Sequence, residues 1–172
     1  VSVDATPLTV EWFRKLKSDP VYRKRHGMDE VPSDLDESVY SDIDGTINFY
    51  KAHGVGCHSL VNQWGDGAIV DAVQGKTVET LLRQRWPNWD ELDILKADIE
   101  GYAPQLVEEI CSKGIAPKLC MLEFEHLTDG KGGYDRRVEM MEKSLQKMKD
   151  IGYTIYLNVL RKKPLTEVIC VN

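Results

Sequence analysis

The chain has 172 residues, 42% of them hydrophobic, and its 22 Lys and Arg against 28 Asp and Glu give a net charge of -6. This length predicts one domain, which buries about 70% of the surface of the unfolded chain and therefore needs no disulfides. The excess of acid argues against a face that binds nucleic-acid phosphates, and no apolar run approaches the ~18 residues of a membrane span.

The cysteines are scattered along the chain without a C-x-x-C pair, at Cys57, Cys111, Cys120 and Cys170. This spacing suits neither a zinc site nor a dense disulfide framework. It favours a reducing compartment, the cytoplasm.

The first residues predict a strand and then a helix. Val1–Ala5 has the pattern of a strand with no lead-in, so we expect the chain to be a piece of a longer protein. Thr6-Pro7 is a helix start, because Thr caps helices and Pro suits the first helical position. The predicted helix runs from Leu8 to about Lys17, and the polar residues 20–36 predict an irregular connection.

The next segment predicts a β-hairpin. Ser38–Ser41 and Thr46–Lys51 are β-like, and Asp44-Gly45 between them favours a tight turn that joins two antiparallel strands. The Gly-rich residues 52–67 predict a loop, and Ala68–Val73 predict a further strand.

The second half of the chain alternates helices and strands. The predicted elements are a helix from Thr77, a strand at Asp93–Ala97, a helix at Pro104–Lys113, a strand at Leu119–Phe124, a helix at 135–150, and strands at Tyr153–Leu160 and Thr166–Val171. Such alternation is typical of an α/β fold, a mostly parallel sheet covered by helices on both faces. The last two strands are joined by too few residues for a crossover, so we expect them to pair antiparallel.

Polar residues, most of them acidic, follow four of the predicted strands. They are Asp4 after the first strand, Ser41-Asp42 after the second, Asp98 and Glu100 after the central one, and the run Glu123–His126 at the end of the next. In α/β sheets, ligands bind beyond the carboxyl ends of the strands, so these residues are the candidates for a functional site.

Each candidate also has an ordinary structural interpretation. Asp4 is either a solvated turn residue or a carboxylate that accepts hydrogen bonds from the two hydroxyls of a ribose. Asp98 and Glu100 are either acids favoured by a helix N-terminus or a base or metal ligand that faces the sheet crevice. His126 is either a loop histidine or a neutral base at physiological pH.

Six segments of the chain resemble, in order, motifs of the FkbM-type methyltransferases. Asp93–Gly101 resembles their "DLLKIDIEG" segment, and Val78–Leu82 resembles their "TLDTLL" helix. The other four are Val3–Pro7, similar to "FDPTP", Ser41–Thr46, similar to "LSDKDGT", His58–Leu60, similar to "HSL", and Leu122–His126, similar to a "VEFH"-like strand. Each motif alone is weak, but six in sequence over nearly the whole chain are fairly specific.

The resemblance implies a class I S-adenosylmethionine-dependent methyltransferase. This is a three-layer, Rossmann-like sheet of seven strands, mostly parallel with a reversed last strand. By resemblance, Asp4 binds the cofactor ribose, and Ser41 and Asp42 flank the adenine. The family's first strand and its Gly-rich cofactor loop would lie before Val1, so residues 1–172 are expected to be a single methyltransferase domain that lacks them.

The resemblance also assigns the transfer chemistry. The family acts mostly on hydroxyls of sugars or natural products, which implies a small-molecule acceptor and O-methylation. Asp98, Glu100 and His126 are the candidates for acceptor binding or general-base work, with no division of the roles among them.

Two other functions stay open. A cluster of Asp98, Glu123, Glu125 and His126 suits a divalent metal, which would make the protein a metal-dependent hydrolase. The third interpretation is a catalytically inactive fold that serves as a binding module.

Overall fold

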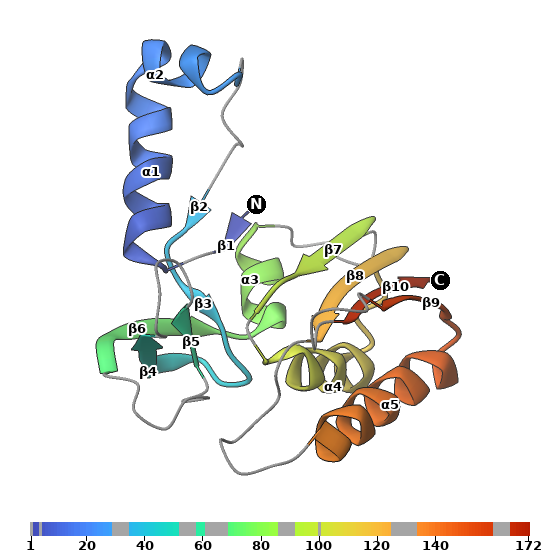
Figure 1. Ribbon diagram of the computed structural model, residues 1–172. Helices are drawn as coiled ribbons and strands as arrows, with labels where there is room; N and C mark the ends of the chain where they lie inside the picture. Colours follow the sequence, from blue (N-terminus) through green and yellow to red (C-terminus); the bar gives the residue numbers. More distant parts are fainter. Residues whose placement is uncertain are drawn as a thin grey trace.

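The computed structural model describes residues 2–3, 5–28, 35–51, 58–60, 69–85, 92–99, 101–124, 134–159 and 166–172. In chain order its elements are β1 (Ser2–Val3), α1 (Pro7–Ser18), α2 (Pro20–Arg25), β2 (Leu35–Asp36), β3 (Val39–Tyr40), β4 (Gly45–Lys51), β5 (His58–Ser59), β6 (Ile69–Lys76), α3 (Val78–Arg85), β7 (Ile94–Ala97), α4 (Ala103–Lys113), β8 (Leu119–Phe124), α5 (Tyr134–Asp150), β9 (Thr154–Val159) and β10 (Thr166–Val171). The protein is α/β, and its described strands form a two-stranded sheet and two four-stranded sheets (Figure 1).

The C-terminal half forms a four-stranded sheet in the order β7-β8-β10-β9. β7 and β8 run parallel, with Ala97 beside Leu122, because α4 provides the crossover between them. β10 runs antiparallel to both β8 and β9, and Cys170 lies opposite Cys120. The predicted antiparallel pairing of the last two strands is therefore confirmed.

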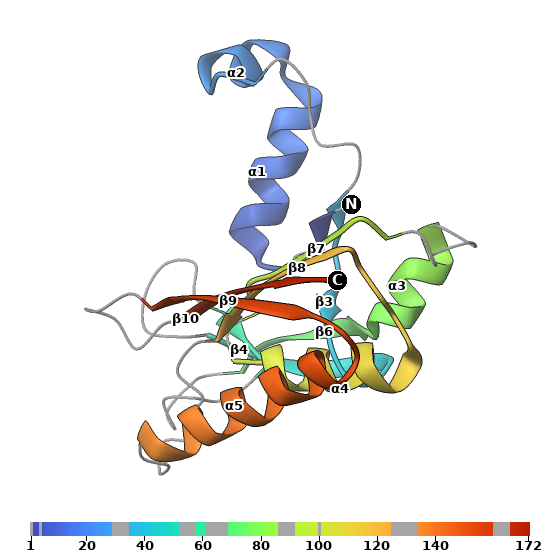
Figure 2. The same cartoon turned by 90° about the vertical axis from the view of Figure 1, so that its right-hand side faces the viewer.

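The main core lies between this sheet and three helices. Figure 2 shows the sheet nearly edge-on, with α4 and α5 on one side of it, and Val78 and Leu82 of α3 belong to the same core. Leu106 and Ile110 of α4 and Met148 of α5 are buried in one cluster with Leu122 and Val168 of the sheet. Each side chain of this size stabilises the fold by about 1.5–3 kcal/mol through burial.

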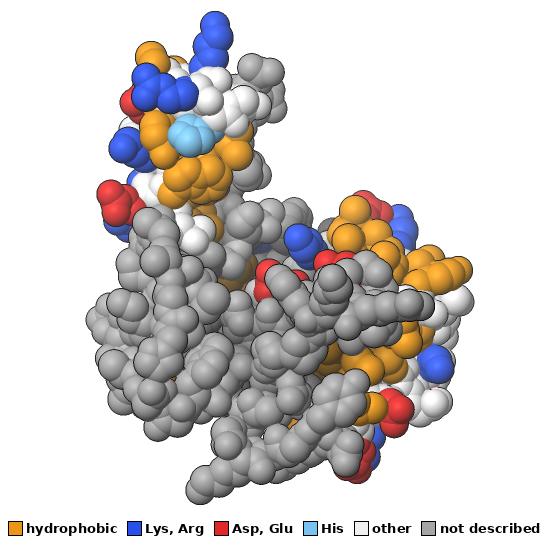
Figure 3. Space-filling view, in the orientation of Figure 1, with side chains coloured by type: hydrophobic (Ala, Val, Ile, Leu, Met, Phe, Trp, Pro, Cys, Tyr) orange, Lys and Arg blue, Asp and Glu red, His pale blue; other side chains and the backbone are white. Residues whose placement is uncertain are grey.

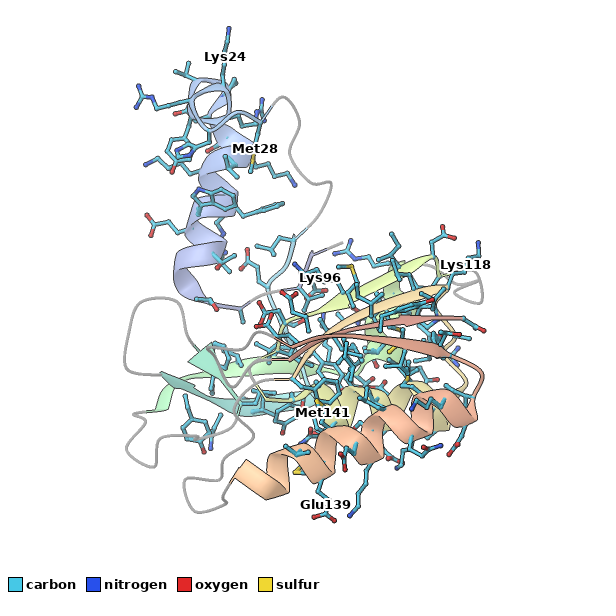
Figure 4. The ribbon with its side chains drawn as sticks, turned by 45° about the vertical axis from the view of Figure 1, so that its right-hand side comes forward. Lys24, Met28, Lys96, Lys118, Glu139 and Met141 are labelled. Atoms are coloured by element: carbon cyan, nitrogen blue, oxygen red, sulfur yellow. The ribbon has the colours of Figure 1, made fainter. Side chains whose placement is uncertain are left out.

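The α5 helix illustrates how helical periodicity sets this packing. Leu145 and Met148, three positions apart, are both buried. Figure 4 shows Met141 on the side of α5 toward the sheet and Glu139 on the opposite side. Residues three or four positions apart share a helix face, so the apolar side chains reach the core together.

The C-terminal sheet differs from the expected three-layer sandwich. Its face away from α4 and α5 leaves large apolar side chains exposed, namely Ile94, Met121, Tyr156 and Val171. Among the described strands, three pairs are parallel and four are antiparallel. The expectation of a mostly parallel sheet is wrong for these residues, because β4 as well as the reversed last strand β10 has two antiparallel neighbours.

The other four-stranded sheet has the order β3-β6-β4-β5, which contradicts the predicted hairpin. β6 lies between β3 and β4, so Ser38–Ser41 and Thr46–Lys51 are not neighbours. The eight residues of β6 offer β4 a longer hydrogen-bonded ladder than the two residues of β3. Asp44 precedes β4 and accepts hydrogen bonds from the Thr77 amide (2.9 Å) and the Thr80 hydroxyl (2.7 Å), at the start of α3.

A buried carboxylate holds the first turn of α3. Glu109 of α4, only 8% exposed, accepts hydrogen bonds from the backbone amides of Val78 (3.2 Å) and Glu79 (2.9 Å). The first amides of a helix have no partner inside the helix, so a side chain from another element satisfies them here. Glu109 therefore ties α3 to α4.

α1 and α2 form a bent helical arm. Asp19 joins them, and its carboxylate accepts hydrogen bonds from the amides of Val21 (2.9 Å) and Tyr22 (3.0 Å), which starts α2. The predicted irregular connection over 20–36 is therefore wrong for α2, and β5 falls inside the predicted loop at 52–67. No helix in the described part of the chain is long and apolar enough to cross a membrane.

Candidate functional site

A cavity of about 490 Å³ lies along β7 and reaches β3. Its wall is mostly apolar side chains of β7 and α3, with Tyr40 of β3 on one side. Lys96 and Asp98 are the charged residues that line it. Cavities of about 300–1,000 Å³ with a few polar groups are typical of small-molecule sites.

Asp98 lies where the sequence predicts it, directly after β7 and exposed. It lines the same cavity as Tyr40, although the two residues are far apart in the chain. The carboxyl ends of β3 and β7 therefore contribute to one cavity.

Ser41 and Asp42 follow β3 and have different environments. Ser41 is buried, its amide donates to the Lys76 carbonyl (2.9 Å), and its hydroxyl accepts a hydrogen bond from the Ile43 amide (3.3 Å). These contacts fix the turn after β3, so Ser41 has a structural role. Asp42 is exposed, and its negative charge acts on Tyr102 as described next.

Two tyrosines connect the end of β3 to the start of α4. The rings of Tyr40 and Tyr102 meet edge to face, with centroids 6.3 Å apart. Burial is the larger cause and the negative charge of Asp42 the smaller cause of a pKa of Tyr102 that lies above its ordinary value. Burial, and then the charge of Glu109, raise the pKa of Tyr40 far above its ordinary value. Both hydroxyls therefore stay protonated near neutral pH and can donate hydrogen bonds.

The sequence did not single out these tyrosines. Tyr40 belongs to a short β-like run and Tyr102 follows a glycine, and neither pattern marks an aromatic pair. The available signal was position, because Tyr40 immediately precedes Ser41-Asp42 and Tyr102 follows Gly101 of the "DIEG"-like segment.

An ion pair connects the strands β2 and β6. The ammonium of Lys76, at the end of β6, lies 2.8 Å from the Asp36 carboxylate of β2 and also donates to Gln84 (3.1 Å). Burial alone would raise the pKa of Asp36, but hydrogen bonds from Lys76 and Ser38 and the Lys76 charge lower it below its ordinary value. The pair joins β2 to β6, and the Lys76 carbonyl holds Ser41.

Several predicted site residues lie outside the described residues. They are Asp4, Glu100 and His126, together with Glu125 of the alternative metal cluster. Within the described ranges, no group of three or more His, Cys, Asp or Glu side chains is arranged to hold a metal ion.

The described site therefore has an apolar cavity of small-molecule size that Tyr40 and Asp98 line. Tyr102 contacts the ring of Tyr40, and the exposed Asp42 follows Tyr40 by two residues. Carboxylates accept hydrogen bonds, so Asp42 and Asp98 suit a ligand that carries hydroxyl or amino groups. No protein-family model, curated protein or solved structure matched the chain.

Proposed function

We propose that the chain is the core of an S-adenosylmethionine-dependent methyltransferase that methylates a hydroxyl of a sugar or small natural product. The proposal rests first on one juxtaposition. Asp98, from the segment that resembles "DLLKIDIEG", lines the cavity that also reaches Tyr40, next to the segment that resembles "LSDKDGT".

The strand directions support a Rossmann-like arrangement as part of this proposal. β7 and β8 run parallel with α4 as the crossover, and β10 is reversed relative to both of its neighbours. A reversed last strand is what the resemblance implies. The cavity runs along β7 and includes its carboxyl end, the end at which α/β sheets bind their ligands.

The residues present suit part of the cofactor. The apolar wall of the cavity suits the adenine ring, and Asp42 and Asp4 would accept hydrogen bonds from the amino and hydroxyl groups of the adenosine. When bound, the cofactor supplies a methyl group on a positively charged sulfur, which makes that methyl open to attack.

The protein then has to place the acceptor and remove its proton. Positioning two reactants in line supplies much of the rate of such a displacement. Asp98 would accept the proton of the acceptor hydroxyl or orient that hydroxyl, together with Glu100 and His126. A positioned base contributes about 10²–10⁴-fold.

Calorimetric titration of the intact protein with S-adenosylmethionine tests the proposal. We expect binding, and we expect Asp42→Asn to weaken it by about tenfold or more, the effect of losing a hydrogen bond to a charged group. Asp98→Asn should lower methyl transfer to a panel of sugars by about 10²-fold or more.

Asp93→Asn is the matched control, because Asp93 precedes the same strand β7 and forms an exposed ion pair with Lys118 (2.7 Å). It should change neither binding nor transfer. Absence of cofactor binding by the intact protein would refute the proposed function.

A further inference from the structure

The helical arm formed by α1 and α2 extends away from the two four-stranded sheets, and α2 lies at its far end (Figures 1 and 2). The bend between the helices is well fixed. Besides the Asp19 cap, Arg23 donates to the carbonyls of Leu16 and Lys17 at the end of α1 (3.3 Å each). The Lys15 ammonium lies 4.8 Å from the centre of the Tyr22 ring. The arm therefore presents its tip as a defined surface.

The tip is strongly basic. Five of the 22 Lys and Arg of the chain fall between residues 15 and 25, with Asp19 as the single acid among them. Asp19 is occupied in capping α2, and Arg14 pairs with Glu37 at the base of the arm. Figure 3 shows basic side chains gathered around apolar ones at the end of the arm, and Figure 4 shows Lys24 at its extremity.

An exposed apolar side chain lies among these cations. Val21 is 69% exposed, and Lys24 and Arg25 follow it by three and four residues, so the three share one face of α2. Together with Pro20 they line a shallow hollow of about 460 Å³. Trp12 of α1 is a second partly exposed apolar side chain, at 37%.

We propose that the tip of this arm, Lys17 with Pro20, Val21, Lys24 and Arg25 of α2, binds the surface of an anionic phospholipid membrane. A helix face that combines cations with apolar side chains inserts the apolar part among the headgroups, while the cations pair with lipid phosphates. Attraction of each Lys or Arg near such a surface multiplies the partition coefficient by about fivefold.

Two features favour a membrane over a nucleic acid. The phosphates of a nucleic acid would also attract the cations, but a nucleic acid offers no apolar phase for Val21. In addition, α2 has no aromatic side chain that is as exposed as Val21 and could stack on bases. The arm also extends beyond the two sheets, so its tip can reach a bilayer while most of the acidic body stays away from it. This inference does not depend on the proposed methyl transfer.

Flotation of the 172-residue chain with vesicles tests the proposal. One set of vesicles contains equal parts of phosphatidylserine and phosphatidylcholine, and the other contains phosphatidylcholine alone. We expect binding to the anionic set only, weakened by added salt. Lys24→Ala and Arg25→Ala should each lower the partition coefficient by about fivefold. Val21→Ser should lower it without changing the salt dependence.

Lys149→Ala is the matched control, because Lys149 is an exposed lysine near the end of α5, on a different part of the molecule. It should leave binding unchanged. Equal binding to both sets of vesicles, no binding, or retention on single-stranded RNA without vesicle binding would overturn the proposal.

Discussion

Replacing Glu109 tests whether one buried carboxylate joins α3 to α4. In Glu109→Ala, the amides of Val78 and Glu79 lose their acceptor. Val78 is buried, so its amide is left without water or protein as a partner. Hydrogen bonds to a charged group contribute about 1.5–3 kcal/mol each, and an unsatisfied buried amide costs about 1–3 kcal/mol.

Two effects act in the opposite direction. Alanine favours helix by up to about 0.5 kcal/mol at this position, and removal of a buried carboxylate relieves its desolvation. The net loss should be about 2–4 kcal/mol, from a total that is about 5–15 kcal/mol for a typical domain. With a urea slope of about 2 kcal/mol/M, the unfolding midpoint should fall by about 1–2 M.

The neighbouring residue provides the control. Glu108 lies on the same helix, is exposed and pairs with Lys147 of α5. An exposed ion pair contributes about 0–1 kcal/mol, so Glu108→Ala should shift the midpoint by less than about 0.5 M. Glu109→Gln, whose amide oxygen can still accept one hydrogen bond, should fall between the two. Equal shifts of the urea midpoint for Glu109→Ala and Glu108→Ala would refute the stabilising role of Glu109 at the start of α3.

Three further predictions concern pH, close packing and a buried hydroxyl. The pKa of Asp36 is lowered in the folded protein, so the stabilising effect of its charge is complete above the unfolded pKa of about 3.9 and is lost as pH falls through the folded pKa. Urea unfolding at several pH values should show that Asp36→Asn is less stable than the unchanged protein at neutral pH, and that this difference in unfolding free energy becomes smaller in acid. A Cβ on Gly75 would lie 2.7 Å from Cδ1 of Ile47 and 3.0 Å from Cβ of Ser41, so Gly75→Ala should cost about 1–3 kcal/mol by the same assay, and no loss would contradict the packing. Tyr153→Phe removes the hydroxyl that donates to the buried Pro117 carbonyl (2.5 Å) and should cost about 1 kcal/mol; a neutral effect would mean that this bond contributes nothing.

The second half of the fold was predictable from sequence because each element there is long enough to show its period. The strand Leu119–Phe124 and the strand Thr166–Val171 have the predicted bounds, and Gly114 ends α4 in the left-handed conformation expected of a C-terminal glycine. The helix predicted at 135–150 begins one residue earlier, at Tyr134.

The first half was harder because its elements are short or depend on distant partners. α2 has six residues, too few for a period, although Asp19-Pro20 is the same kind of helix start as Thr6-Pro7. The hairpin failed for another reason. Asp44-Gly45 carries a local turn signal, but β6, whose residues come later in the chain, competes for the edge of β4.

The candidate site was likewise predictable from sequence only in part. Asp98 was predictable because it follows a clear strand, and the structure places it on a cavity with Tyr40. Tyr102 was not, because the edge-to-face contact of the two tyrosines depends on the tertiary arrangement of β3 and α4.

Burial separates the acids that serve the fold from those that reach solvent. A buried carboxylate needs partners to offset its desolvation, and Asp36 and Glu109 both have them, in Lys76 and in the first amides of α3. Asp42 and Asp98 are exposed, so the fold does not require burial of their charge. Variants of the buried pair should therefore lower stability before they affect ligand binding. Variants of the exposed pair should affect binding or turnover more than stability, and this difference tells the two groups apart without knowledge of the acceptor.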